Sequence, residues 1–273
     1  MELHCHSVYS RGSKIPWEGL SRPKEIVKAV KRAGLDGFSL TDHRVTEGLP
    51  EAARYARKHG LVFIPGVEVQ TLDGHVIALG ITEPVKNFRS LEETLDEIRS
   101  QGAVSVAPHP FDIKGEGLRH KAGKVDAIEV FNSLNLDKLS NFAARRVAEK
   151  TGKPAVCGSD AHSLEMIGAS VNEAEASDAE EFLRAVKKGR VSVSGSYIPT
   201  PVVISWARER LRLSYGDVLK YVRKNYGFPK NLLAEYMLKK FVASESPFWK
   251  VLASVGLNIS RIYGSFKILS YFI

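Results

Sequence analysis

Short apolar runs alternate with amphipathic stretches along the first 200 residues of the chain. Apolar runs of strand length lie at residues 36–40, 61–64, 74–79, 103–107, 125–131, 154–157 and 191–193. Apolar residues recur at helical spacing at residues 23–33, 47–59, 90–100, 136–151 and 178–188, with Ser21 and Ser90 as expected helix caps. Strand and helix in alternation with short connections predict parallel strands, joined by right-handed crossovers. About seven such strands indicate a barrel-like α/β fold.

The first six residues carry the earliest chemical signal. Residues 1–6 have the pattern of a strand, and side chains alternate between the two faces of a strand. His4 and His6 therefore point the same way, about 7 Å apart along the strand, while Leu3 and Cys5 point into packing. Two imidazoles so placed can reach one metal ion or two adjacent ones, although a lone His-x-His pair is equally often an ordinary surface or core pair.

Most of the remaining unusual polar residues fall at or beside the predicted strand ends. They are Asp42, His43, Glu68, His75, His109, Asn132, Asp160 and His162. Any one of them alone has an ordinary explanation, since Glu68 could cap a helix and Asp160 could form an Asx-turn. In an α/β barrel, however, the carboxyl ends of the strands gather the active-site residues.

Six of the eight histidines and two carboxylates share this pattern. Imidazole together with carboxylate suits zinc, iron or manganese, and the donors exceed the needs of one four-coordinate ion. Glu68 could then bridge two ions with its two oxygens. His59, at a predicted helix end, and His120, in a basic loop, are left out of the site.

Five motifs in this order resemble the PHP family of metal-dependent phosphoesterases over residues 1 to about 195. The motifs are His4-x-His6, Thr41-Asp42-His43, Gly66-x-Glu68, Pro108-His109-Pro110 and Gly158-Ser159-Asp160-Ala161-His162. The resemblance implies a distorted seven-stranded (β/α) TIM-like barrel that hydrolyses phosphate esters through a metal-activated water. It implies two or three divalent ions, either Zn, Mn or Fe, held by His4, His6, His43, Glu68, His109, Asp160 and His162.

The resemblance also assigns less direct roles. His75 would be a further ligand or a phosphate contact, and either His75 or His162 could protonate the leaving alkoxide. Glu129 and Asn132 match a Glu-x-x-Asn segment of the family. Many members carry an acidic residue or a histidine shortly after the first motif, whereas this chain has Arg11 there. An arginine cannot ligate a metal but can clamp a phosphate, so Arg11 is either a substrate clamp or an exposed loop residue, and the third metal is in question.

Composition and charge change the picture only for the last quarter of the chain. The 273 residues carry a formal net charge of +8. From Pro201 onward 12 Lys and Arg stand against 4 Asp and Glu, which leaves 27 of each sign and no net charge in residues 1–200. Two cysteines form no disulfide framework, no apolar run has the length of a membrane span, and no signal pattern opens the chain. A cytoplasmic protein is therefore expected.

The last quarter is predicted to be helical and holds no His or Cys, so catalysis is not expected there. The preferred interpretation is a helical cap on the barrel, since Leu232, Leu233, Met237 and Phe241 demand burial. The alternative is a nucleic-acid surface, with Tyr221 and Tyr226 available for stacking and a basic core of Lys220, Arg223, Lys224, Lys230, Lys239 and Lys240. The end of the chain from Phe266 is apolar enough to dock on a partner, a second subunit or a membrane surface.

These observations predict a catalytic barrel at residues 1–198 and a basic helical extension at residues 199–273. The expected activity is that of a phosphoric ester hydrolase acting on monoesters or diesters of small molecules or nucleotides. The alternatives are a nuclease guided by the basic extension and a non-catalytic scaffold like the archaeal ribonuclease P subunit that shares the fold. The retained histidines argue against a scaffold, and an oligomer is compatible with the sequence.

Overall fold

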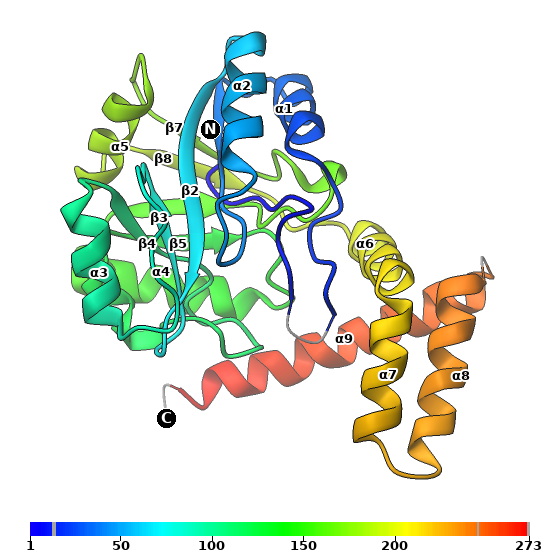
Figure 1. The fold of residues 1–273 in the computed structure, drawn as a ribbon. Helices are drawn as coiled ribbons and strands as arrows, with labels where there is room; N and C mark the ends of the chain where they lie inside the picture. The colour runs from blue at the N-terminus through cyan, green and yellow to red at the C-terminus, as the bar shows by residue number, and fades with distance from the viewer. Residues whose placement is uncertain (13–14, 245, 272–273) are drawn as a thin grey trace.

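A curled six-stranded sheet forms the centre of the protein, as the computed structural model in Figure 1 shows. The structure describes residues 1–12, 15–244 and 246–271. The strands follow one another in chain order across the sheet, as β1 (Gly37–Leu40), β2 (Val62–Gln70), β3 (His75–Leu79), β4 (Val104–Ala107), β5 (Ala127–Asn132) and β6 (Ala155–Gly158). This arrangement with flanking helices confirms the predicted mixed α/β, barrel-like class.

The expectation of parallel strands throughout is wrong for β3. The pairs β1–β2, β4–β5 and β5–β6 are parallel, but β3 is antiparallel to both of its neighbours. Only residues 71–74 connect β2 to β3, which is enough for a hairpin and far too short for a parallel crossover. The hairpin pairs Gln70 with His75, so the start of β3 lies at the same end of the sheet as the end of β2.

The N-terminal residues connect the two edges of this sheet. Glu2 forms a parallel bridge with Phe38 of β1, and Cys5 forms another with Ala161, just after β6. The expected strand at residues 1–6 is therefore present as two isolated bridges, one to each edge. The segment draws the first and the last strand together, and the six-stranded sheet curls towards a barrel.

Amphipathic helices cover the sheet. They are α1 (Pro23–Arg32), α2 (Leu49–His59), α3 (Leu91–Ser100), α4 (Lys138–Thr151) and α5 (Ala179–Lys187). Ser90 caps α3 as expected, whereas the N-cap of α1 is Arg22 and not Ser21. Apolar faces of α1 and α2 pack on β1 through buried side chains such as Ile26 and Phe38. A small antiparallel sheet pairs β8 (Ser192–Gly195) with β7 (Ser170–Glu173), a strand that the hydrophobic pattern did not predict.

Four helices make up the C-terminal extension. They are α6 (Thr200–Leu213), α7 (Tyr215–Asn225), α8 (Lys230–Ala243) and α9 (Pro247–Leu269). Figure 1 shows α7 and α8 projecting side by side away from the sheet, while α9 runs back beneath it. No helix in the described part of the chain has the length and apolar character that a membrane span needs.

The inner face of α9 docks on the barrel by specific contacts. Arg261 donates from Nε to the carbonyl of Leu136 at 3.0 Å, and Lys267 donates from Nζ to the carbonyl of Ile113 at 2.7 Å. Gly264 is buried so closely against Ile113 that a Cβ there would lie 2.3 Å from the isoleucine Cγ2. The extension thus includes at least one helix that is packed as a cap.

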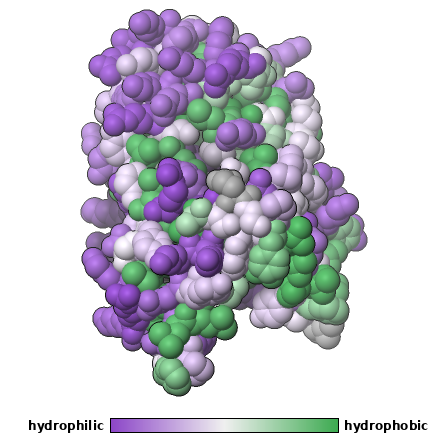
Figure 2. Space-filling model, turned by 90° about the vertical axis from the view of Figure 1, so that its right-hand side faces the viewer, coloured by the Kyte–Doolittle hydropathy of each residue, from purple (hydrophilic) through white to green (hydrophobic). Residues whose placement is uncertain are grey.

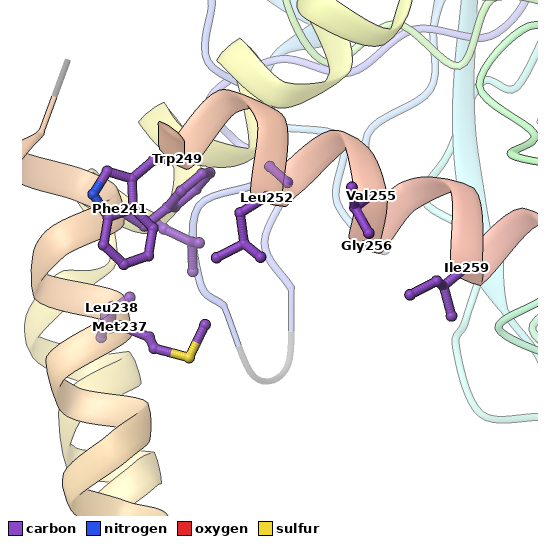
Figure 3. Close-up of a pocket in the computed structure, with 10 residues that line it drawn as sticks. Met237, Leu238, Phe241, Trp249, Leu252, Val255, Gly256 and Ile259 are labelled. Carbon is purple, nitrogen blue, oxygen red and sulfur yellow. The ribbon is translucent and has the colours of Figure 1, made fainter. Parts of the chain in front are cut away.

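Burial in the extension differs from the expectation for two leucines and a methionine. Leu232 and Leu233 are 57% and 61% exposed, because α8 projects from the barrel and turns these side chains to solvent. Met237, which is 39% exposed, and the partly buried Phe241 line an apolar pocket of about 460 Å³ between α8 and α9, where the side chains of the two helices point toward one another (Figure 3). The last two residues of the apolar chain end, 272–273, lie outside the described residues.

Candidate metal centre

The histidines of the N-terminal segment point into the mouth of the curled sheet and are almost fully buried. The Nε2 atoms of His4 and His6 lie 3.1 Å apart. Each ring uses its other nitrogen for support, His4 Nδ1 to Glu129 Oε1 at 2.9 Å and His6 Nδ1 to the Ser10 hydroxyl at 3.3 Å. A carboxylate behind a histidine orients the ring of a metal ligand and raises its basicity. In the expected Glu-x-x-Asn segment, Glu129 thus supports the ring of His4, and Asn132 donates a hydrogen bond to Glu129.

Glu68 lies at the centre of the cluster. It belongs to the interior of β2, which continues to Gln70, and so the expectation that the strand ends before it is wrong. Its Oε1 lies 2.7 Å from His75 Nδ1 and 3.1 Å from His109 Nε2. Its Oε2 lies 3.0 Å from His43 Nδ1 and 3.4 Å from the Nε2 atoms of both His4 and His6. One fully buried carboxylate is therefore surrounded by five imidazoles.

The second carboxylate comes from the loop after β6. Asp160 Oδ1 lies 3.2 Å from His6 Nε2 and 3.5 Å from His4 Nε2. The same residue accepts a hydrogen bond at its backbone carbonyl from His162 Nδ1 at 2.7 Å. Asp160 and His109 both have positive φ, 54° and 28°, a conformation that non-glycine residues rarely adopt. Such strain persists where surrounding structure enforces it and is typical of functional sites.

A glycine makes the close packing behind His4 possible. A Cβ on Gly158 would lie 2.0 Å from Glu129 Oε1 and 2.5 Å from the Cβ of His4. Only hydrogen fits at this position, at the end of β6. Gly158 is therefore required for Glu129 to approach and support the ring of His4.

Charges within the cluster compensate one another. Burial raises the pKa of Glu68, but His43 and His75 outweigh it and hold that pKa well below its usual range. The pKa of Asp160 is likewise held low against burial, mainly by His4. Conversely, burial lowers the pKa of His4, but Asp160 and Glu129 hold it well above the usual value, and Glu68 raises the pKa of His109 to about 9 despite burial. Two buried carboxylates therefore require positive charge beside them.

The donor set fits divalent metal ions. Ligand atoms lie within 4.8 Å of one another in four overlapping groups, His6–His43–His162, His4–His6–Glu68, His4–His109–Asp160 and His43–Glu68–His75. Glu68 Oε2, His75 Nδ1 and His109 Nδ1 are buried and form no well-aligned hydrogen bond among the described residues, although His75 Nδ1 lies 2.7 Å from Glu68 Oε1 and Glu68 Oε2 lies 3.0 Å from His43 Nδ1. Imidazole and carboxylate donors suit zinc, manganese or iron, and positive ions would satisfy the two carboxylates. All eight residues expected as ligands thus converge in one place.

Arg11 lies differently from the substrate clamp considered above. Its side chain is exposed, and its guanidinium carbon lies 3.8 Å from the centre of the Trp17 ring. Its backbone carbonyl accepts a hydrogen bond from Arg44. This stacking favours the alternative of a loop residue, and a phosphate contact by Arg11 stays a prediction.

Glu18 is the site residue that the sequence reasoning missed. Its Oε2 lies 3.4 Å from His43 Nε2, and its Oε1 pairs with Arg210 of α6. The signal was present, because the family pattern asks for an acidic residue after the first motif and Glu18 is the first one after His6. Arg210 and its neighbour Trp206, whose ring centre lies 4.9 Å from that of His162, carried no such signal.

Comparisons with known proteins agree with this geometry. The PHP domain family model matches residues 2–109, and the PHP-associated model matches residues 138–191. An uncharacterised protein of Methanocaldococcus jannaschii is 30% identical over 164 residues, 57% of this chain and 95% of the relative. A 3',5'-nucleoside bisphosphate phosphatase of Chromobacterium violaceum is 36% identical over 112 residues, 38% of this chain and 37% of the phosphatase.

Solved structures show the same fold at low sequence identity. A two-domain protein of Bacteroides vulgatus that contains a PHP-like metal-dependent phosphoesterase aligns with a TM-score of 0.57 and 19% identity, covering 71% of this chain and 64% of its own. PsfC of Pseudomonas syringae aligns with a TM-score of 0.55 and 19% identity, covering 78% and 97%. At these identities the likeness concerns the fold alone.

Proposed function

Since the chain belongs to the PHP family of metal-dependent phosphoesterases, we propose that it hydrolyses phosphate esters of small molecules or nucleotides at the cluster around Glu68. Two or three divalent ions would be held by His4, His6, His43, Glu68, His75, His109, Asp160 and His162. The single observation that carries the proposal is Glu68, a fully buried carboxylate whose two oxygens each face separate imidazoles. When bound, such ions polarise phosphoryl oxygens and lower the pKa of bound water.

The chain's own residues have distinct parts in this proposal. Glu129 holds the His4 ring by its Nδ1 atom, and Gln70 holds His75 by Nε2 at 2.6 Å, so both rings keep a fixed orientation. His162, which lies beside Trp206 at the edge of the cluster, is the better placed of the two proposed proton donors to the leaving alkoxide. His75 is about as buried as His162, but its Nε2 is bonded to Gln70 and its Nδ1 faces Glu68.

The nuclease alternative receives less support from the extension. Relatives include a 5'-3' exoribonuclease of Haemophilus influenzae, 28% identical over 109 residues. Much of the basic charge, however, has a structural partner within the chain. Arg210, Arg261 and Lys267 bind backbone carbonyls of the barrel, and Arg223 forms a two-point pair with Glu235. We therefore propose small phosphate esters as substrates, and the extension as part of the catalytic unit.

Metal analysis combined with phosphate release tests the proposal. Protein purified without chelator should carry at least two ions per chain and release phosphate from a nucleotide or sugar phosphate, and chelation should abolish both. The double variant His4→Ala with His6→Ala should lose metal and activity together. His59→Ala, which removes an imidazole at the end of α2, is the matched control and should keep both. Hydrolysis by the chelated protein at the untreated rate would contradict the proposal.

A further inference from the structure

We infer that helix α6 is a working part of the metal centre, because Arg210 and Trp206 position the Glu18 carboxylate against His43. This role rests on the proposed function and assigns part of the support of the metal centre to a helix outside the barrel. The N-terminal loop that carries Glu18 lies beside α6 (Figure 1). Nearly 190 residues separate the two along the chain, so the contact exists only in the folded protein.

Hydrogen bonds and an ion pair tie the loop to α6. Trp206 donates from Nε1 to the carbonyl of Glu18 at 2.9 Å, and Arg210 donates from Nε to the carbonyl of Trp17 at 2.7 Å. The Arg210 guanidinium also pairs with the Glu18 carboxylate. At the end of the helix, the buried Ser214 hydroxyl accepts from the backbone nitrogen of Trp17 at 3.1 Å. Both the backbone and the side chain of Glu18 are therefore held from one helix.

The Glu18 carboxylate links this helix to the cluster. One oxygen pairs with Arg210 and the other faces His43 Nε2. The side chains of Glu18 and Arg210 are only 13% and 15% exposed, so removal of either partner leaves a poorly solvated charge. An exposed ion pair would contribute little, but this pair is largely shielded from water, and Arg210 also binds the carbonyl of Trp17, so the geometry of both groups is fixed.

Trp206 also contacts a second histidine of the cluster, His162. Its ring packs on that of His162 at 4.9 Å between centres, while its Nε1 is bonded to Glu18. One side chain thus contacts a proposed ligand, His162, and the loop that carries a third carboxylate, Glu18. Hydrogen-bonded partners of metal ligands set the orientation of those ligands and typically change metal affinity 10- to 100-fold when removed.

Metal affinity of the full chain, measured by Mn²⁺ competition with a chromophoric chelator, tests this role without an activity assay. Arg210→Ala should bind the Glu18-dependent ion about tenfold more weakly. Arg210→Lys should recover part of the loss, because lysine keeps the charge without the planar fork. The control is Arg212→Ala, which removes an arginine paired with Glu209 within the same helix and should bind as the unaltered protein does.

A double-mutant cycle decides whether Arg210 acts through Glu18. Glu18→Gln should weaken the same ion, and adding Arg210→Ala to it should weaken the ion no further. Full additivity of the two losses, or unaltered affinity of a folded Arg210→Ala protein, would overturn the role of α6. If His4→Ala with His6→Ala also leaves the ions bound, the proposed function itself is wrong, and the two failures are thereby distinguished.

Fluorescence supplies a second readout for Trp206. Paramagnetic Mn²⁺ bound at the cluster should quench Trp206, and Trp206→Phe should lose the larger part of the quenching. Trp249→Phe removes a tryptophan whose ring packs on Phe248 rather than on a proposed ligand, and it should keep most of the quenching. Quenching that survives Trp206→Phe and disappears in Trp249→Phe would contradict the placement of the ions next to α6.

Discussion

The barrel mouth buries ionisable side chains, whereas the C-terminal helices expose large apolar ones. At the mouth, His4, Glu68 and Asp160 lie buried or nearly buried in a small volume, where each charge is costly unless another compensates it. Along α8 and α9, large apolar side chains such as Leu233, Tyr263 and Phe266 are more than 60% exposed. Figure 2 shows hydrophobic residues in both halves of one face, including a broad area in the lower half, where the C-terminal helices lie.

The difference separates charge that performs chemistry from charge that holds structure. Convergent buried ionisable groups are expensive and persist where they bind something. The net positive charge of the extension is instead dispersed, and Arg210 and Arg261 donate hydrogen bonds to backbone carbonyls of the barrel. A segment's net charge therefore says less about its function than the partner of each charged group.

The largest expected effect concerns the centre of the mouth. Glu68→Gln should lower the phosphate-release rate at least about 100-fold, because an amide cannot bridge two cations. Loss of a group that only supports a metal ligand costs up to about 100-fold, and Glu68 would itself be a ligand. His75→Ala should lower the rate less, since it removes one imidazole beside Glu68 and leaves the carboxylate in place. Steady-state rates of both folded variants measure this. The reverse order would mean that the bridge lies elsewhere.

A second prediction tests whether the mouth depends on close packing behind it. Gly158→Ala should push Glu129 away from His4, destabilise the fold by roughly 1–3 kcal/mol and weaken metal binding about tenfold. Urea denaturation and metal titration measure the two effects. The control Gly34→Ala replaces a glycine that has open space but positive φ, so it should lower stability without touching metal affinity. Unchanged metal affinity in Gly158→Ala would show that the support of His4 is dispensable.

The docking of α9 supplies a third prediction within one helix. Gly264→Ala should destabilise the protein by about 1–2 kcal/mol, because its Cβ meets Ile113. Gly256→Ala faces open space and should stabilise α9 by up to about 1 kcal/mol through helix propensity. Urea midpoints of the pair measure the contrast. Equal and positive shifts would mean that α9 does not dock on the barrel as a cap.

The smallest effect is expected at the exposed lysines of α8. Lys239→Gln with Lys240→Gln should leave hydrolysis of a small substrate unchanged, because both side chains are exposed on α8, which projects away from the barrel (Figure 1). Oligonucleotide binding by the unaltered chain should be weak, and gel-shift titrations at two salt concentrations check it. Tight binding whose salt slope falls by up to roughly 2 units in the double variant would restore the nuclease alternative.

Sequence patterns determined most of the elements and nearly all of the proposed donors. Alternating apolar runs predicted the strands up to β6, and the eight donors from His4 to His162 were predicted from their place at or beside expected strand ends together with the motifs of the family resemblance. This worked because strand ends in such folds are brought together by the chain path itself. Glu18 was within reach of the same reasoning, since an acidic residue was expected after the first motif.

Only the tertiary structure decided the rest. The antiparallel direction of β3 depends on a short hairpin, and it is this reversal that brings His75 beside Glu68. The exposure of Leu232 on α8 and the contact of Arg210 with Glu18 depend on where whole helices come to rest. Periodicity describes which face of a helix is apolar but contains no information about its distant partner. Contacts across nearly 190 residues are set by the packing of the complete fold, and the link between the extension and the metal centre is of that kind.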